Sequence, residues 1–213
     1  MKFEEVVRFV GDLQCFDLPL LTQAFSVKRP GLRVQLSRWM KDGKVIGVRR
    51  GVYVLSPTYR RRPLNTGILA NQLYYPSYLS GQWALGYYDM IPEHVVWLTS
   101  VTSRAPRRFE SQVGVFDYRN IKQSFFFGYG TRKVGDQEVM VADPEKALLD
   151  YWHLNAGEWT LPRLAEMRYQ NREKVSGERL REYAVRFDSP RLLRAVERWL
   201  KLMAEEQEGW VAV

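Results

Sequence analysis

The sequence predicts an α+β protein built from two unequal parts. Three observations carry this prediction: apolar residues recur at helical spacing up to residue 41, two β-rich runs follow before residue 56, and the remainder passes from short β-rich runs to long helical stretches. The chain has 213 residues, of which 46% are apolar and 26% are charged, the balance of a globular protein. We expect a first domain over residues 1–56, a basic linker over 57–63 and a second domain over 64–213.

Composition excludes several classes of protein. No apolar stretch approaches the roughly 20 residues that span a bilayer, and the start of the chain lacks the apolar core of a signal peptide. The single cysteine, Cys15, can form neither an intrachain disulfide nor a cysteine-based zinc site. We therefore expect a cytoplasmic protein with no membrane partner and no cofactor.

The positive charge is concentrated at one end of the sequence. The whole net charge of +8 belongs to residues 1–62, which hold 13 Lys and Arg against 5 Asp and Glu, whereas residues 63–213 hold 19 of each. A basic part joined to a neutral one suggests that the first part meets a polyanion and that the second has another task. Charge alone carries no sequence information, so the pattern of residues has to identify the partner.

The first part predicts three helices followed by a hairpin. Its elements are a helix over residues 3–13, a short helix that Asp17 caps, a third helix over residues 31–41 with Pro30 in its first turn, and strands over residues 45–48 and 52–55. Gly43 fits the left-handed residue that ends a helix. Three helices and a hairpin with a basic tip, in about 55 residues, form the order of a winged helix-turn-helix domain.

The third helix has one apolar arc and one cationic arc at about 100° per residue. The apolar arc holds Leu32, Leu36, Trp39 and Met40 and should pack on the first two helices. The opposite arc would face the major groove of DNA, which admits a helix, while the hairpin tip would reach phosphate or the adjacent minor groove. The predicted DNA-binding residues are Lys28, Arg29, Arg33, Ser37, Arg38, Lys41, Arg49 and Arg50. The alternative, an ordinary solvated face, is disfavoured because helix and hairpin converge on one surface.

The second part begins near Leu64 and predicts a mixed α/β domain with a helical C-terminus. Its elements are helices over residues 66–73 and 77–88, strands over 95–101, 113–118, 124–129 and 139–141, a helix that Asp143 caps and Pro144 opens, and helices over 161–169, 177–187 and 189 to about 208. For the linker residues Arg60, Arg61 and Arg62 the sequence leaves two interpretations open, phosphate contact and plain solvation.

No motif of an established catalytic chemistry stands out. The sequence has no phosphate-binding glycine loop of the P-loop or dinucleotide type and no nucleophile elbow. Glu93-His94 and Asp150 with His153 could offer metal ligands, but nothing obliges these segments to meet, so we predict no metal site. The segment Asp143-Pro144-Glu145-Lys146 has the residue types that nucleases use to hold Mg²⁺, although helix capping explains it better.

A resemblance to a known family rests on motifs in both parts of the chain. The motifs are residues 36–46 (LSRWMKDGKVI), 50–55 (RGVYVL), 76–80 (PSYLS), 84–85 (AL), 99–102 (TSVT) and 141–150 (VADPEKALLD). Over residues of about 30 to 155 the chain resembles the AbiEi-type antitoxins of bacterial type IV toxin–antitoxin and phage abortive-infection systems.

The resemblance implies a function for each part. The winged helix would bind inverted repeats in the promoter of its own operon and repress transcription, with two copies pairing on the DNA. The second part would be an antitoxin domain that counteracts a cognate nucleotidyltransferase toxin, directly or indirectly. The catalytic signature of the toxin is absent from the chain, so we expect no enzyme activity. Arg104, Arg107 and Arg108, in a basic loop, are candidates for contact with a partner or with phosphate.

Two other interpretations stay open at the level of sequence. One is a DNA-directed, metal-dependent nuclease or nucleotide-processing enzyme that the winged helix delivers to DNA. The other is a ligand-sensing winged-helix regulator, which needs a pocket that sequence alone does not show.

Overall fold

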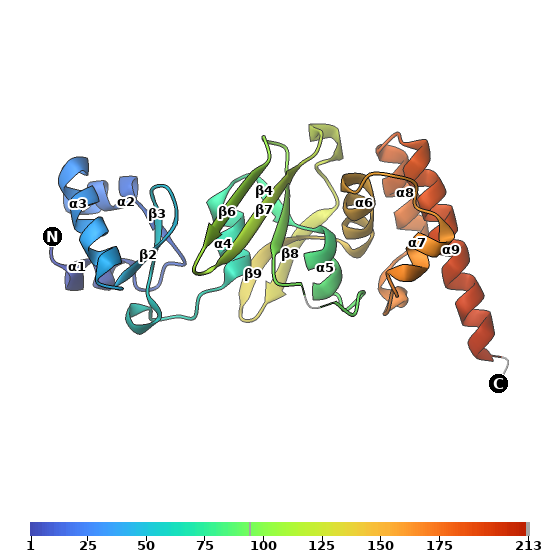
Figure 1. Cartoon of the computed structure of the whole chain (residues 1–213), viewed down its shortest axis with the longest axis horizontal. Coiled ribbons are helices and arrows are strands. Elements are labelled where there is room, and N and C mark those ends of the chain that lie inside the picture. Colours follow the sequence, from blue (N-terminus) through green and yellow to red (C-terminus); the bar gives the residue numbers. More distant parts are fainter. Residues whose placement is uncertain (94, 212–213) are drawn as a thin grey trace.

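The computed structural model describes residues 1–93 and 95–211, and the side chains of residues 1–93 and 95–205. The protein is a mixed α+β chain with two separate sheets. The molecule is elongated, with the N-terminal part at one end and the C-terminal helices at the other (Figure 1). Among the described residues, no helix combines the length and the apolar character needed to cross a membrane.

Three helices and a three-stranded sheet form the N-terminal part. The helices are α1 (Phe3–Val10), α2 (Leu18–Phe25) and α3 (Arg29–Lys41), and the strands are β1 (Phe16–Asp17), β2 (Val45–Arg49) and β3 (Val52–Leu55), with the sheet order β1-β3-β2. The helices enclose a core that includes Val6, Leu21 and Leu36, each 0% exposed. Prediction and structure agree on the three helices and the hairpin, while the two-residue strand β1 is too short to leave a pattern in the sequence.

Local signals explain where α2 begins and α3 ends. The Asp17 carboxylate accepts a hydrogen bond from the Leu20 N–H at 2.9 Å, which confirms the predicted cap of α2. Pro30 lies in the first turn of α3, where its missing N–H costs no intrahelical bond. After α3, Gly43 adopts a φ of +68°, a left-handed conformation that glycine takes without a Cβ clash.

A six-stranded mixed sheet forms the centre of the second part, in the order β6-β7-β5-β4-β9-β8. Its strands are β4 (Ser77–Leu79), β5 (Leu98–Thr102), β6 (Arg107–Ser111), β7 (Gly114–Asn120), β8 (Tyr129–Val134) and β9 (Gln137–Ala142). α4 (Thr66–Leu73) covers the face towards the N-terminal part, and α5 (Gly81–Tyr87) and α6 (Pro144–Leu154) cover the other face (Figure 1). The helices α7 (Leu161–Glu166), α8 (Gly177–Arg186) and α9 (Pro190–Val211) pack beyond α6.

Two predicted elements of the second part are wrong. The segment expected to begin a helix at residue 77 is instead the central strand β4, whose three residues are all buried between β5 and β9. Gly81, the first residue of α5, has a φ of +57°, so a right-handed helix cannot extend back through it. The strand expected over residues 124–129 is a short 3-10 turn (Gln123–Phe125), in which the buried Phe125 ring stacks on Phe187 at 4.6 Å.

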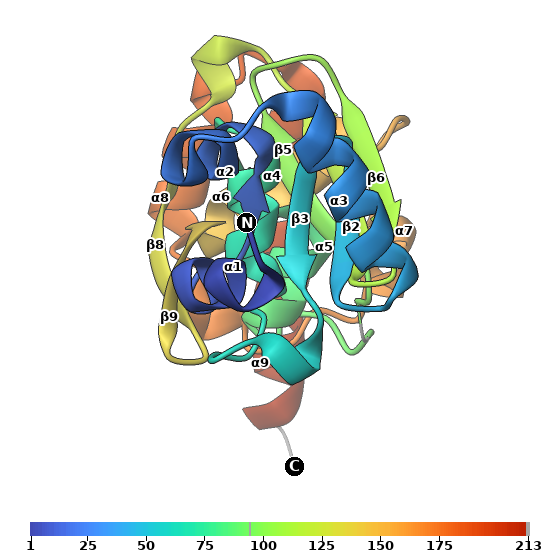
Figure 2. The same cartoon turned by 90° about the vertical axis from the view of Figure 1, so that its left-hand side faces the viewer.

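The hairpin β2–β3 packs against both parts of the molecule. Val45 and Leu55 belong to the N-terminal core, whereas Val48, Val52 and Val54 belong to the large hydrophobic cluster of the second part. The hairpin is therefore held between its own helices and the second part. Seen from the N-terminal end, α3, β2 and β6 lie on the same side of the molecule (Figure 2).

Candidate nucleic-acid interface

The outer face of α3 is strongly basic. The apolar residues of its inner face pack in the core, so its cationic residues face outward. Leu32, Leu36 and Trp39 are 2%, 0% and 6% exposed, and the Trp39 ring meets Phe3 of α1 edge-on at 5.1 Å. This packing fixes the rotation of the helix and turns the polar positions outward. The predicted residues that are exposed on or just before α3 are Lys28, Arg29, Arg33, Ser37, Arg38 and Lys41.

A groove lies between the first half of α3 and the hairpin tip. Arg29 and Arg33 line it from α3, and Arg50 lines it from the hairpin. The Gly51 carbonyl of the tip accepts a hydrogen bond from the N–H of Leu18 at the start of α2, at 3.4 Å, which ties the tip to that helix. Arg49 of the hairpin also lines the groove, so four arginines from two elements converge on it.

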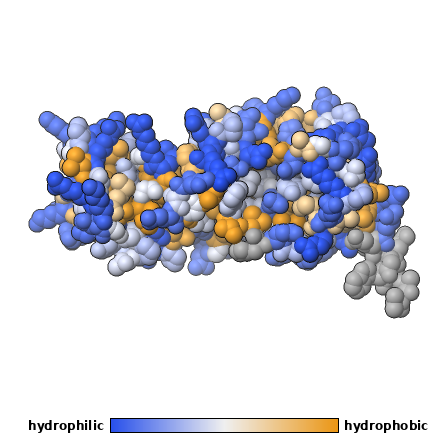
Figure 3. Space-filling view, in the orientation of Figure 1, coloured by the Kyte–Doolittle hydropathy of each residue, from blue (hydrophilic) through white to orange (hydrophobic). Residues whose placement is uncertain are grey.

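Among the described residues, the cations of this surface form no ion pair with a carboxylate. Asp17 also lines the groove, but its carboxylate caps α2. Within the part of the chain that the structure describes, no ion pair involves Lys28, Arg29, Arg33, Arg38, Lys41 or Arg50. Arginines of the C-terminal helices are paired instead, as in Arg181–Glu197 at 2.8 Å. Hydrophilic side chains project from the N-terminal end of the molecule (Figure 3), so positive charge there is available to an external anion.

Arg49, another predicted DNA-binding residue, lines the groove with Arg50, and its side chain also contacts the second part. Its Nε donates a hydrogen bond to the Leu73 carbonyl at 3.0 Å, and its guanidinium lies 5.7 Å from the centre of the Phe109 ring. The side chain is half-buried, whereas Arg50 is exposed.

Met40 also departs from its predicted place on the apolar arc of α3. It is 38% exposed, and a Cβ at Gly47 of β2 would lie only 3.3 Å from its Sδ. Met40 therefore sits over the seam between α3 and β2 instead of in the core. Met40 faces Gly47 of β2, and the helical periodicity of α3 cannot predict a contact with a residue of another element.

The linker arginines are mostly committed to the protein itself. The Arg60 Nε donates to the Leu55 carbonyl at 2.5 Å, and Arg61 pairs with Asp12 at 2.8 Å. Arg62, at 3.9 Å from the same carboxylate, has a side chain that is 65% exposed. Arg60 and Arg61 thus hold the linker to the N-terminal part, although the Arg61 side chain is still 50% exposed.

The three second-part arginines lie on a loop and a strand, not in one basic loop as predicted. Arg104, before β6, donates to the Tyr75 carbonyl at 3.0 Å. Arg107 and Arg108 belong to β6, and Arg108 pairs with Glu110 at 2.7 Å. All three are exposed. Arg104 and Arg108 therefore have partners within the chain, which makes the exposed Arg107 the best candidate of the three for contact with another molecule.

A buried polar network joins two of the second-part motifs, residues 76–80 and 141–150. Lys146 and Asp150, one turn apart on α6, form an ion pair with side chains that are 0% exposed. The same carboxylate accepts hydrogen bonds from the Tyr78 hydroxyl at 3.0 Å and the Ser80 hydroxyl at 2.7 Å. Burial lowers the pKa of Lys146 and raises the pKa of Tyr78. This network lies in the core and has no access to a substrate.

The acidic residues considered for metal chemistry are committed elsewhere. Asp143 does not cap α6 with its side chain as predicted, because its carboxylate binds Arg132 at 2.5 Å and the Tyr183 hydroxyl at 3.1 Å. Glu145 is 1% exposed and accepts the Ser176 N–H at 2.7 Å. Among the described residues no group of Asp, Glu, His and Cys could hold a metal ion, and His94 lies outside them.

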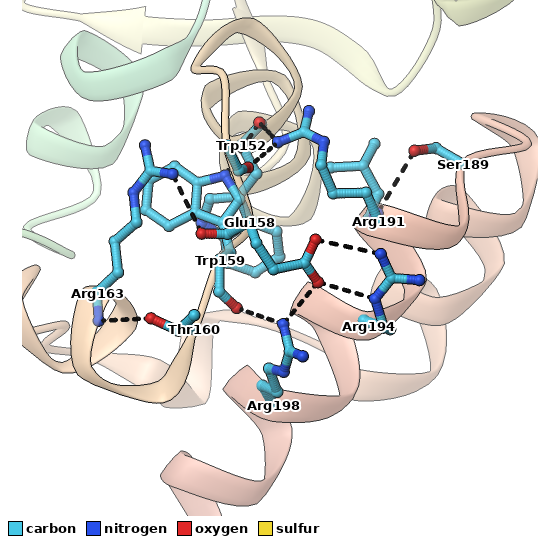
Figure 4. A network of polar contacts seen from close by, with 11 residues as sticks. Trp152, Glu158, Trp159, Thr160, Arg163, Ser189, Arg191, Arg194 and Arg198 are labelled. Carbon is cyan, nitrogen blue, oxygen red and sulfur yellow. Dashed lines mark hydrogen bonds and ion pairs between the residues drawn. The ribbon is translucent and has the colours of Figure 1, made fainter.

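An arginine cluster at the far end of the molecule is structural. Glu158 binds Arg194 of α9 at 2.8 Å and Arg198 at 2.7 Å (Figure 4). These two arginines lower the pKa of Glu158 to about 2. Arg191 donates to carbonyls at the end of α6, among them that of Trp152 at 3.0 Å, where a helix has carbonyls without partners. The cluster fastens α9 to the segment after α6.

Comparison with protein-family models and with curated proteins finds no match for this chain. The case for a function therefore rests on the geometry of the N-terminal surface and on the sequence motifs.

Proposed function

We propose that the protein is a DNA-binding antitoxin of the AbiEi type, which represses its own operon through an N-terminal winged helix-turn-helix. The observation that carries the proposal is the groove in which Arg29, Arg33, Arg49 and Arg50 converge; among the described residues none of the four forms an ion pair. The order α1-β1-α2-α3-β2-β3, with the sheet order β1-β3-β2, supports it, because this is the arrangement expected of a winged helix.

In the proposed complex, α3 lies in the major groove and the hairpin lies beside it over the backbone. α3 has 13 residues and therefore a length of about 20 Å, enough to follow the major groove over several base pairs. Arg33 and Arg38 are suited to bidentate bonds with guanine O6 and N7. Lys28 and Arg29, at the start of α3, and Arg50, at the hairpin tip, are suited to phosphate contacts that would fix the register on the duplex.

Repression would use two copies on an inverted repeat. A two-fold symmetric operator presents the same groove twice, so one helix from each copy can occupy one half-site. Occupation of the promoter by both copies would exclude the polymerase without any catalytic step.

The antitoxin role is proposed for the second part, against a nucleotidyltransferase toxin. It is supported by the motifs at residues 76–80 and 141–150, which are brought together when Tyr78 and Ser80 bind Asp150. The two motifs, which are distant in the sequence, thus contribute to one buried network that stabilises the domain. The nuclease alternative is less well supported because Glu145 is buried and bonded to Ser176.

Two experiments test the proposal. Binding of the full chain to its own upstream DNA and to a scrambled duplex, measured across a salt series, tests the repressor. Co-expression with the product of a neighbouring nucleotidyltransferase gene tests the antitoxin: the chain should restore growth, and a toxin that stays lethal in its presence would refute that role.

A further inference from the structure

The two arginines of the hairpin tip have different surroundings. Both line the groove beside α3, but Arg50 is exposed, whereas Arg49 is half-buried and bonded to the second part. They are neighbours in a tight turn in which Gly51 has a φ of +81°. In so short a turn, the position of one arginine determines where the other can reach.

Arg49 binds the second part at a place that favours a cation. Its partner, the Leu73 carbonyl, belongs to the last residue of α4, where helix carbonyls lack intrahelical partners and carry partial negative charge. The guanidinium also lies over the Phe109 ring of β6 at 5.7 Å, within the range of a cation–π interaction. A third contact, from Arg49 Nη1 to the Arg50 carbonyl at 3.5 Å, joins this anchor to the backbone of the tip.

Neighbouring contacts strengthen the same junction. Val48 and Val52 flank the tip and pack in the hydrophobic cluster of the second part. The Cys15 thiol donates to Gln72 Oε1 of α4 at 3.3 Å, and Gln14 donates to Gln137 Oε1 at 3.1 Å. The second part therefore fixes the hairpin from the side opposite α3.

We propose that Arg49 is a positioning residue for DNA binding: it anchors the hairpin to the second part and thereby holds Arg50 in the groove beside α3. The inference rests on the proposed function of DNA binding. It assigns to Leu73 and Phe109, which lie outside the predicted DNA-binding residues, a share in the affinity for DNA.

In the free protein, the contacts of Arg49 restrict the hairpin to the position in which Arg50 lies in the groove, which is the position competent to bind DNA. When only a fraction of molecules holds the competent position, the apparent dissociation constant rises by the inverse of that fraction. Loss of one hydrogen bond to a charged group changes such an equilibrium constant about 10-fold, and therefore lowers the competent fraction by at most about 10-fold. By linkage, DNA in turn stabilises the contact between the hairpin and the second part.

The test compares Arg49→Met with Arg50→Met in the full chain, using its own upstream duplex across a salt series. Arg50→Met should weaken binding and make the slope of log affinity against log salt less steep by about 0.9, the value for one phosphate contact. Arg49→Met should weaken binding measurably, by up to about 10-fold, with the slope unchanged. Lys133→Met, an exposed change on β8, is the matched control and should leave both quantities unchanged.

A second variant separates positioning from direct contact. Phe109→Leu removes the ring face under Arg49 and keeps an apolar side chain, so it should weaken DNA binding by about 2- to 5-fold. If Arg49→Met flattens the salt slope while Phe109→Leu binds like the wild type, Arg49 contacts phosphate itself and the inference is overturned.

Hydrogen exchange without DNA tests the anchor independently of the proposed function. Amides of residues 48–53 should exchange faster in Arg49→Met than in the wild type, while the thermal midpoint confirms that the variant is folded. Unchanged exchange overturns the inference. Failure of the wild type to prefer its own upstream duplex refutes the proposed function instead, and the two failures are therefore distinguishable.

Discussion

Replacing Asp150 by alanine leaves the Lys146 ammonium group without a countercharge in the core of the second part. Both side chains are 0% exposed, and the same change removes the acceptor of the Tyr78 and Ser80 hydroxyl groups. Breaking a buried ion pair from one side typically costs about 3–5 kcal/mol. We expect Asp150→Ala to lower the free energy of unfolding by this amount and the thermal midpoint by about 6–20 °C for a chain of this size.

The loss depends on pH because burial lowers the pKa of Lys146, and removal of Asp150 lowers it further. A folded state with a depressed lysine pKa binds fewer protons than the unfolded state, so stability rises with pH. The Asp150→Ala variant should therefore recover part of its stability as pH rises towards the ordinary lysine pKa.

The matched control is the double variant Lys146→Met with Asp150→Asn, which removes both charges and retains an acceptor for Tyr78 and Ser80. Urea unfolding followed by circular dichroism measures all three proteins, and the double variant should be clearly more stable than Asp150→Ala. A cost below about 1 kcal/mol for Asp150→Ala, or a double variant that is no more stable, would refute the reasoning.

Three further predictions concern the DNA surface and local geometry. Arg33→Ala and Arg38→Ala should each weaken binding to the operator by about 1–3 kcal/mol and relax base preference at one position. Competition among single-base operator variants measures this, with Lys133→Ala as the control. Equal weakening on all sequences would show that the two arginines contact phosphate only. Glu158, whose pKa is held at about 2 by Arg194 and Arg198, contributes stability that is present above the ordinary glutamate pKa and lost as pH falls through about 2. Glu158→Gln should therefore differ from the wild type at pH 6 and converge with it in strong acid, and a constant difference would contradict this. In urea unfolding, Gly128→Ala should lower the free energy of unfolding more than Gly43→Ala does. Both glycines have a φ near +67°, but only at Gly128 would the new Cβ meet another atom, Tyr183 Cε2 at 2.7 Å. Equal losses would count against a steric contribution.

The N-terminal part is largely predictable from sequence because its signals are local. The Asp17 cap, the Pro30 first turn and the left-handed Gly43 each act within a few residues of themselves. The outward face of α3 follows from three buried positions at helical spacing. These local signals are sufficient to identify the residues that line the groove from α3.

The errors fall where contacts between distant segments decide the outcome. Residues 77–79 are a strand because β5 and β9 lie on either side of them, and a short apolar run cannot show its neighbours. The sequence does not predict β6, because its arginines obscure the apolar alternation of an edge strand. The direction of Arg49 depends on the Leu73 carbonyl, 24 residues further along the chain, and no pattern within the hairpin contains that information.

The central claim, that the N-terminal surface recognises DNA by sequence, is tested most directly by binding of the full chain to its own upstream duplex and to a scrambled duplex across a salt series. Neutralisation of about six to eight phosphates predicts a slope of log affinity against log salt near −5 to −7, with tighter binding to the upstream duplex. Equal and weak binding to both duplexes would contradict the claim and would leave the exposed cations of α3 as a solvated helix face.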